Sequence, residues 1–141
     1  MVCMLIDLDN FKTINDTLGH KAGDDLLCVT AELLRAASRS EDFVARLGGD
    51  EFIVLMPMAD VGVARQVGER LQEEFARRIE PLLAGRQIPK TPSLSIGISS
   101  RKLCQTESFA DVVSSADGAL YQAKGAGKRT IFVYNPIKSA A

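Results

Sequence analysis

Two adjacent glycines, Gly48 and Gly49, lie between two strand-like segments and constrain the fold more than any other feature of the chain. The flanking residues 42–47 and 51–56 are rich in the branched and aromatic side chains that favour strands. Because a short glycine linker between such segments is typical of a tight turn, the sequence predicts a β-hairpin. Two acidic residues directly follow the glycines, so we expect negative charge at the tip of this hairpin.

Strand-like and helix-like hydrophobic patterns alternate along the rest of the chain. Residues 1–8 form a short apolar run typical of a buried strand, and residues 94–99 alternate apolar and small residues like a half-buried strand. The expected elements are strands at 1–8, 42–47, 51–56, 94–99 and 130–134, helices at 22–37, 61–83 and 109–123, and a turn region at 85–92. This order predicts an α+β fold, an α/β sandwich in which helices cover a sheet.

Composition is that of a single domain with its own core. The chain has 141 residues, of which 46% are hydrophobic and 25% charged. A formal net charge of -1 gives no general attraction for a nucleic-acid polymer or an anionic membrane. No apolar stretch approaches the roughly 18 residues of a membrane span. We therefore expect a cytoplasmic domain that does not itself insert into a membrane.

Cysteine and histidine usage argues against disulfides and zinc. Cys3, Cys28 and Cys104 are odd in number, scattered and set among apolar residues, so we expect reduced thiols in the core. His20 is the single histidine and no CxxC pair is present, which excludes the usual zinc ligand sets.

Acidic residues gather at two places that the expected sheet can bring together. Asp7 and Asp9 end the first strand, and Asp50 and Glu51 follow the hairpin glycines. If the first strand lies beside the hairpin, these carboxylates converge and repel one another unless a cation neutralises them. Hard oxygen ligands of this kind suit Mg²⁺ or Ca²⁺. The alternative is a plain tight turn whose acids are solvated at its tip.

Two familiar ligand loops do not match. The segment DLDNFKTINDTL does not match an EF-hand calcium loop. Phe11 stands at the third ligand position, Lys12 at the position of the required glycine, and Leu18 at that of the terminal glutamate. The segment QAKGAGKRT does not match a phosphate-binding P-loop. Gln122 stands at the position of the first glycine of that motif, and Arg129 stands at the position of its Ser or Thr.

The segment GAGK nevertheless offers cations after a helix. Lys124, Lys128 and Arg129 are candidate phosphate contacts, and Gly125 and Gly127 let the chain fold closely over a ligand. The alternative is a helix end capped by glycines, at which cations complement the helix dipole.

Four segments in order carry a resemblance to a known family: DLDNFKTINDTLGHKAGDDLL, RSEDFVARLGGDEF, LSIGIS and ADGALYQAKGAGK. They resemble the successive motifs of the GGDEF family, the diguanylate cyclases. The resemblance implies a palm-like fold similar to that of nucleotidyl cyclases, with a ferredoxin-like core and a mostly antiparallel sheet. It also implies condensation of two GTP into the second messenger cyclic di-GMP with release of pyrophosphate, by a homodimer that forms at least transiently.

The resemblance further implies a metal site and catalytic residues. Asp7, Asp50, Glu51 and the Leu8 carbonyl resemble the metal ligands of the family, which imply Mg²⁺ or Mn²⁺, two ions per half-site. Asp50, Glu51 and Lys12 are the catalytic residues that it implies.

A GTP site is implied as well. Asn15 and Asp24 match the positions that read the guanine edge. His20 either borders that pocket or packs at the start of a helix. Main-chain amides near Asn10 and Phe11 would approach the phosphates, whose charge lysines would neutralise. The implied substrate-binding residues are Asn10, Phe11, Asn15, His20, Asp24, Gly48, Gly49, Lys124 and Lys128.

The segment RSED implies regulation by product. Arg39 and Asp42 match the RxxD inhibitory site of the family, in which Arg grips guanine or phosphate. Arg70, on the expected long helix, is a candidate second contact. Taken without the family context, an Arg and an Asp at this spacing are ordinary surface residues.

The chain also departs from the family pattern. The usual N-terminal helical segment is not seen before the first strand, so we expect residues 1–136 to form an N-terminally truncated GGDEF domain, with 137–141 as a tail and some apolar sheet surface uncovered. Lys128 and Arg129 replace a usual Arg-Asn pair, which removes a bidentate contact. Two alternatives to a cyclase stay open: a non-catalytic cyclic di-GMP receptor, and a GTP-sensing or dimerisation module.

Overall fold

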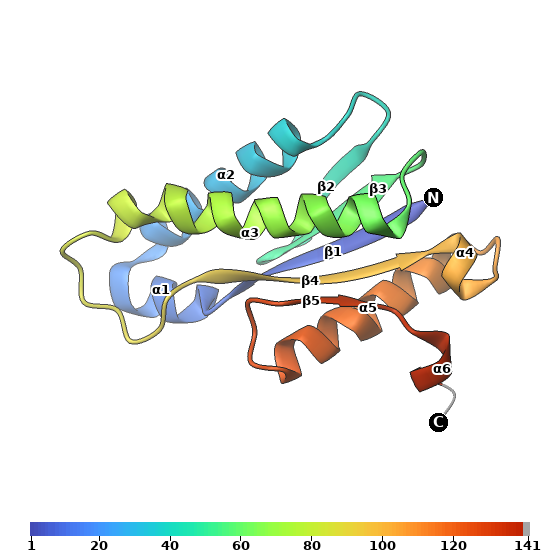
Figure 1. The fold of residues 1–141 in the computed structure, drawn as a ribbon. Coiled ribbons are helices and arrows are strands. Elements are labelled where there is room, and N and C mark those ends of the chain that lie inside the picture. Colours follow the sequence, from blue (N-terminus) through green and yellow to red (C-terminus); the bar gives the residue numbers. More distant parts are fainter. Residues whose placement is uncertain (140–141) are drawn as a thin grey trace.

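A five-stranded sheet in the order β2-β3-β1-β4-β5 forms the centre of the domain, with helices on both faces (Figure 1). This computed structural model describes residues 1–139. The elements are β1 (Val2–Asp9), α1 (Phe11–Leu18), α2 (His20–Ala37), β2 (Phe43–Gly48), β3 (Glu51–Met56), α3 (Val61–Leu83), β4 (Ser93–Ser100), α4 (Arg101–Cys104), α5 (Phe109–Gly125), β5 (Ile131–Val133) and α6 (Pro136–Ser139). Neighbouring strands are antiparallel except β4 and β5, which are parallel. The predicted α+β fold with a mostly antiparallel sheet is confirmed.

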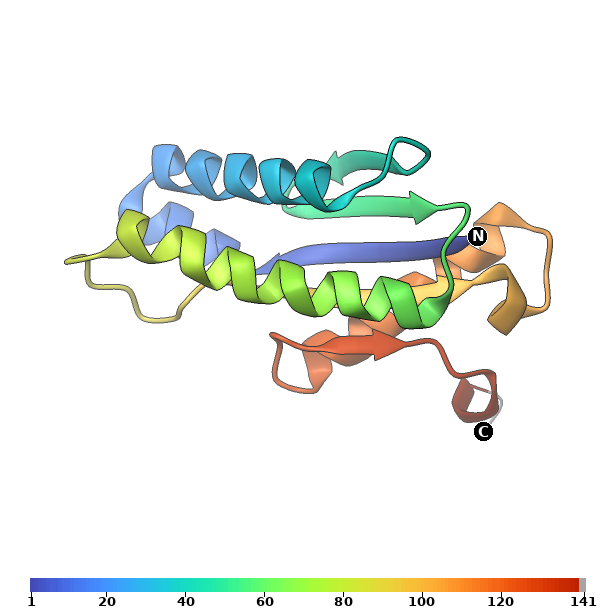
Figure 2. The same ribbon diagram turned by 45° about the horizontal axis from the view of Figure 1, so that its top comes forward.

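The central strand β1 separates two apolar layers, because successive side chains of a strand point to opposite faces. On one face Met4 and Ile6 pack into the larger core with α2 and α3. On the other face Cys3 and Leu5 pack against α5. Figure 2 shows α2 beside α3 on the near side of the sheet and α5 on the far side. The same alternation places the side chain of Asp7 on the α5 face.

Strand β4 is buried along nearly its whole length, which corrects the expectation of a half-buried strand. Along β4 large and small side chains alternate: the large ones belong to the core that includes α3, and the small ones face α5. A Cβ atom at Gly97 would collide with the main chain of Ala116 and Leu120 on α5. The missing side chain therefore lets α5 lie directly on the sheet.

Three short helices are not predicted by the hydrophobic pattern. Helix α1 follows β1 after a single residue, and its eight residues include only one that is fully buried. Helices α4 and α6 have four residues each, too few to show a helical period. Of the expected tail at 137–141, residues 137–139 belong to α6 and residues 140–141 lie outside the described part of the chain.

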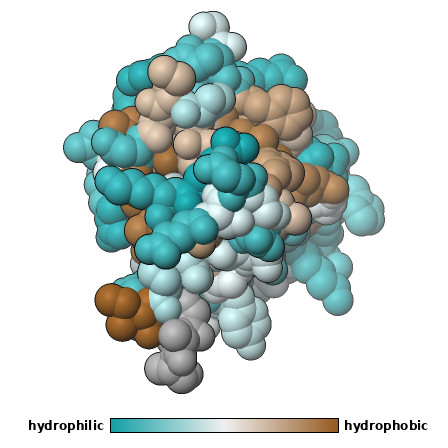
Figure 3. All heavy atoms as spheres, turned by 90° about the vertical axis from the view of Figure 1, so that its right-hand side faces the viewer, coloured by the Kyte–Doolittle hydropathy of each residue, from teal (hydrophilic) through white to brown (hydrophobic). Residues whose placement is uncertain are grey.

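Part of the apolar surface is not covered by helices. Phe43 and Leu47 on the edge strand β2 are 57% and 54% exposed. Phe43 pairs with Leu55, which pairs with Cys3, so it belongs to the α5 face of the sheet. Figure 3 shows that apolar atoms also reach the surface on the side that carries the N-terminus in Figure 1. Within residues 1–139 no helix has both the length and the hydrophobicity to cross a bilayer.

The cysteines differ in exposure, which gives a first testable prediction. Cys3 is buried, Cys104 is partly buried, and Cys28 is exposed on α2, so the expectation of three core thiols is wrong for Cys28. Burial, and then the neighbouring Cys104, raise the pKa of Cys3 to about 12. A chromogenic disulfide reagent should therefore label Cys28 first and leave Cys3 unmodified until the protein unfolds. Cys28→Ser should remove the fast phase, and a fast phase that survives in this variant would contradict the assignment.

Candidate functional site

The end of β1 lies beside the tip of the β2–β3 hairpin. Asp7 pairs with Glu51 across the two antiparallel strands. The amide of Leu8 donates a hydrogen bond of 3.1 Å to the main-chain carbonyl of Asp50. The predicted convergence of the two acidic segments is therefore confirmed.

The hairpin turn uses both glycines in conformations that favour this residue. Gly48 has φ 144° and Gly49 has φ 52°. The Nε atom of Arg46 donates to the carbonyl oxygen of Gly49 at 2.9 Å, which fixes the turn from one side. As a result Asp50 is held at the hairpin end of the sheet, next to the last residues of β1.

Two carboxylates at this edge, Asp7 and Glu51, have raised pKa values. Burial raises the pKa of Asp7 to about 6, and Asp50 adds to this rise while Lys124 opposes it. Burial also raises the pKa of Glu51, as do the nearby carboxylates of Asp117 and Asp50. The Oδ1 atom of Asp7 is buried, and the partner that it has is the ammonium group of Lys124, 3.3 Å away. Negative charge is therefore concentrated at a point where a cation would be stabilised.

A lysine from α5 reaches this acidic edge. The Nζ atom of Lys124 lies 3.3 Å from Oδ1 of Asp7 and 2.8 Å from Oδ1 of Asp9. Hydrogen bonds and the charges of these two aspartates outweigh burial and raise the pKa of the lysine, which keeps it charged. Lys124, proposed from the sequence as a phosphate contact, thus forms ion pairs with two aspartates at the C-terminal end of β1.

Asp9 is the centre of this network: the sequence predicts it as one of the converging acids, but the site residues that the family resemblance implies do not include it. Its side chain is 0% exposed and accepts hydrogen bonds from Ser93, Ser95, Lys124 and the main-chain amide of Arg129, at 2.7, 2.7, 2.8 and 3.1 Å. Burial alone would raise the pKa of Asp9, but these hydrogen bonds outweigh burial and lower it. Asp9 therefore joins β1, β4 and the segment after α5.

The donor set fits a cation that is bound together with a phosphate. Within residues 1–139 no three acidic, histidine or cysteine side chains converge into a complete metal cluster. Asp50 is close enough to raise the pKa of Asp7, whose buried Oδ1 atom has only the ion pair with Lys124. One or two carboxylates are what Mg²⁺ commonly takes from a protein when waters and substrate phosphates supply its other ligands.

The N-terminus of α1 borders the same edge. Asn10 links β1 to α1 with φ 64°, and its side-chain Nδ2 atom donates to the main-chain carbonyl of Thr91 at 2.9 Å. The Nζ atom of Lys128 donates to Oδ1 of Asn10 at 3.1 Å. Lys12 lies in the first turn of α1 and is exposed. The amides at the start of α1, with Lys12 and Lys128, can therefore receive an anion such as a phosphate.

Asn15 and Asp24 lie on the adjacent helices α1 and α2. A Cβ atom at Gly23 would collide with the side chain of Asn15, so the glycine makes room for it. The Oδ1 atom of Asn15 is buried and accepts no hydrogen bond from residues 1–139. Asp24 is exposed beside Gly23. His20 is exposed at the first residue of α2, which excludes the alternative that it packs in the interior.

Arg39, Asp42 and Arg70 line one hollow of about 230 Å³ near the other end of the hairpin. The main-chain amide of Arg39 donates to Oδ2 of Asp42 at 2.8 Å. This bond orders the turn before β2 and leaves the guanidinium of Arg39 exposed. The structure thus brings Arg70, on α3, to the same hollow as Arg39 and Asp42, which precede β2.

The mixed sheet, its two helical layers and its acidic hairpin end define a palm-like α+β domain. The family model described as "Diguanylate cyclase, GGDEF domain" matches residues 1–130. This chain belongs to the GGDEF family.

Curated relatives contain this domain within longer proteins. Diguanylate cyclase A of Treponema denticola is 38% identical over 128 residues, which cover 91% of this chain and 33% of the relative. Cyclic di-GMP phosphodiesterase NbdA of Pseudomonas aeruginosa is 36% identical over 128 residues, which cover 91% of this chain and 16% of the relative. The chain thus spans about a third or less of the length of these relatives.

A solved structure has the same fold. The GGDEF domain of DgcB from Caulobacter crescentus, in complex with cyclic di-GMP, superposes with a TM-score of 0.81 at 27% identity. The match covers 94% of this chain and 77% of that chain. The palm-like fold predicted from the sequence motifs is confirmed.

Proposed function

We propose that this domain condenses two molecules of GTP into cyclic di-GMP and two pyrophosphates as a metal-dependent homodimer in the cytoplasm. The observation that carries the proposal is the contact between the ends of β1 and the hairpin, which places Asp7 next to Asp50 and close to the first turn of α1. Membership of a family whose relatives include diguanylate cyclases supports this activity.

Each residue at this edge then has a chemical role. Asp7, Asp50 and the Leu8 carbonyl would hold the cation, and Glu51 would assist them or accept the proton of the attacking hydroxyl. When bound, Mg²⁺ or Mn²⁺, two ions per half-site, would polarise the α-phosphate and neutralise developing charge. Lys12 would neutralise further charge on the phosphates during the reaction.

GTP itself would lie across α1 and α2. The amides near Asn10 and Phe11, with Lys128 and then Lys124, would contact the triphosphate, and Gly48 and Gly49 leave space beside it. The exposed carboxylate of Asp24 would accept hydrogen bonds from N1 and N2 of guanine, and the side-chain amide of Asn15 can both donate and accept. His20 would border the base.

Two such half-sites must face each other. The ribose 3′-hydroxyl of one GTP attacks the α-phosphorus of the other, the bond from that phosphorus to pyrophosphate breaks, and the second half-reaction closes the ring. Because each domain holds one nucleotide, the reaction requires two copies to align them.

Incubation of the purified protein with GTP and Mg²⁺, followed by separation of the nucleotides, tests the proposal. Cyclic di-GMP and pyrophosphate should form in a ratio of one to two, at a rate that rises with protein concentration as dimers form. Binding of GTP without turnover would refute the cyclase proposal and favour a GTP-sensing or dimerisation module.

The hollow lined by Arg39, Asp42 and Arg70 is a candidate site for product inhibition. Two exposed guanidinium groups around one cavity suit the phosphates and guanines of cyclic di-GMP. Arg39→Ala should weaken cyclic di-GMP binding by about tenfold or more, because a charge-assisted hydrogen bond is lost. Isothermal titration measures this change, with Arg86→Ala, at an exposed position outside this hollow, as the matched control. Inhibition that is unchanged in Arg39→Ala would remove the assignment.

The same hollow favours a second candidate function, a non-catalytic receptor of cyclic di-GMP. It needs Arg39, Asp42 and Arg70 but not the acidic edge. The receptor alternative predicts tight binding of cyclic di-GMP in a protein that forms none from GTP, so the two measurements above separate it from the cyclase.

A further inference from the structure

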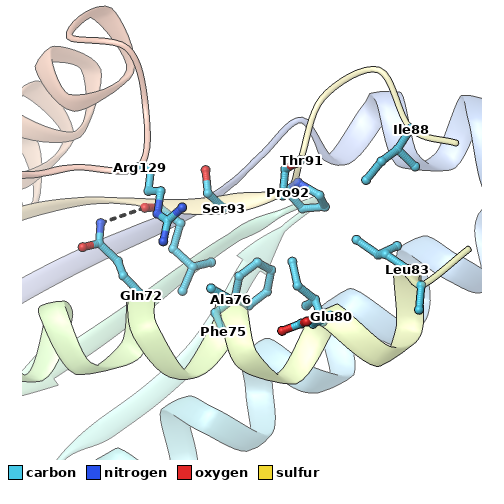
Figure 4. Close-up of a pocket in the computed structure, with 13 residues that line it drawn as sticks. Gln72, Phe75, Ala76, Glu80, Leu83, Ile88, Thr91, Pro92, Ser93 and Arg129 are labelled. Carbon is cyan, nitrogen blue, oxygen red and sulfur yellow. Dashed lines mark hydrogen bonds between the residues drawn. The ribbon is translucent and has the colours of Figure 1, made fainter. Parts of the chain in front are cut away.

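A larger hollow, here called the α3–β4 pocket, has no role in the proposed cyclase reaction. It lies between α3, the 84–92 segment and the start of β4, and has a volume of about 410 Å³. Figure 4 shows Leu83 and Ile88 at one end and Gln72 with Arg129 at the other. Phe75, which is 1% exposed, lies between the two ends. This volume falls within the range of roughly 300–1,000 Å³ that is typical of small-molecule sites.

The polar groups of the pocket are few and placed at defined positions. The side-chain Nε2 atom of Gln72 donates to the main-chain carbonyl of Leu94 at 3.0 Å, so this group already has a partner. Arg129 is exposed, and its guanidinium forms no ion pair among the described residues. The one carboxylate on the wall belongs to Glu80, on the helical side. An apolar cavity with a cation at one end suits a ligand with an apolar body and one anionic head.

We propose that the α3–β4 pocket binds a small amphipathic carboxylate. Its apolar chain or ring system packs against Phe75, Leu83 and Ile88, which removes apolar surface from water. Its carboxylate accepts paired hydrogen bonds from the guanidinium of Arg129, a geometry that carboxylates match well. A polyphosphate or a nucleotide would bury several negative charges in this largely apolar pocket with only the guanidinium of Arg129 to pair them, which disfavours such ligands here.

The wall of this pocket is connected to the acidic edge by three hydrogen bonds. Ser93 and the amide of Arg129 both donate to Oδ2 of Asp9, at 2.7 and 3.1 Å. The carbonyl of Thr91 accepts from Asn10 at 2.9 Å. A ligand that shifts these residues must also affect Asp9 and Asn10, so binding should be detected at both places.

Titration of dodecanoate, below its micelle concentration, into ¹⁵N-labelled protein tests the proposal without GTP or a metal. Saturable shifts should appear at amides of the pocket and at Asp9 and Asn10. Dodecyltrimethylammonium, which has the same chain with a cationic head, should bind at least about tenfold more weakly. Absence of saturable shifts in the pocket, or equal binding of the two amphiphiles, would overturn the proposal while leaving the cyclase proposal intact.

Three charge variants test whether the carboxylate of dodecanoate binds to Arg129. Arg129→Gln should weaken dodecanoate binding by about tenfold, because a charge-assisted pair is lost. Glu80→Gln should strengthen binding by about two- to threefold, because it removes a repelling carboxylate. Arg86→Gln is the matched control, since it removes the same charge from an exposed position that does not line the pocket, and it should change binding little. Equal effects of Arg129→Gln and Arg86→Gln would contradict the assignment.

A fourth variant blocks the pocket itself. Ala76 lines the cavity and is partly exposed, so Ala76→Trp can fill the space from one wall. This variant should abolish the dodecanoate shifts while keeping the amide spectrum of a folded domain. If it fails to fold, Ala84→Trp, at a more exposed position on the rim, serves the same purpose. Undiminished binding in a folded, blocked variant would overturn the proposal.

Discussion

Asp50→Asn is expected to lower the rate of cyclic di-GMP formation by about a thousandfold or more. The substitution replaces a carboxylate that lies beside Asp7 at the meeting point of β1 and the hairpin. Loss of a charged metal ligand removes several kcal/mol of transition-state stabilisation, and each 1.36 kcal/mol is about tenfold in rate. The measurement is the initial rate of product formation at saturating GTP and Mg²⁺.

Asp60→Asn is the matched control for this experiment. Asp60 caps α3 by accepting a hydrogen bond of 2.8 Å from the amide of Val63, and asparagine caps a helix about as well. The control loses the same charge at a position outside the acidic edge, so its rate should stay near that of the wild type. A folded Asp50→Asn protein with wild-type activity would refute the metal site.

Asp9→Ala should lower the free energy of unfolding by about 3–5 kcal/mol, the largest stability effect that we expect from a single substitution here. The fully buried carboxylate accepts four hydrogen bonds, one of them from Lys124, whose charge would lose its closest partner. Denaturant unfolding with a two-state fit measures the change. A loss below about 1 kcal/mol would show that the network adds little to stability.

Two further variants separate the network from the charge alone. Asp16→Ala removes an exposed carboxylate from α1 and should change stability by less than about 0.5 kcal/mol. Ser95→Ala removes one donor to Asp9, and its effect should be smaller in the Asp9→Ala background than in the wild type. Such a double-mutant cycle measures the coupling of the two residues directly.

The fold and the acidic edge could be predicted because they depend on local patterns with a fixed period. A strand alternates its two faces, so the apolar run before Asp7 and the hairpin before Asp50 determine which side chains meet when the strands pair. The long helix at 61–83 was predicted with the observed bounds because its apolar stripe is regular. Predicting these features did not depend on knowing any contact between distant residues other than the pairing of strands.

The remaining features depend on tertiary contacts that the patterns do not specify. Asp9 is identified as a central residue only when Ser93 and Lys124, 84 and 115 positions away, are seen to bond to it. Cys28 lies among apolar residues in the sequence, yet the turn of α2 directs it to solvent. Burial of β4 follows from the close approach of α5 at Gly97. Each error arose where packing between elements decided the outcome.

The passage from β1 to α1 through Asn10 alone limits how this edge can vary. One residue with φ 64° turns the chain, and its side-chain Nδ2 atom donates a hydrogen bond to the carbonyl of Thr91. An inserted residue would rotate α1 by about 100° about its axis and turn Asn15 away from Gly23, since a helix has roughly 3.6 residues per turn. The junction can therefore accept exchange of side chains but not a change of length.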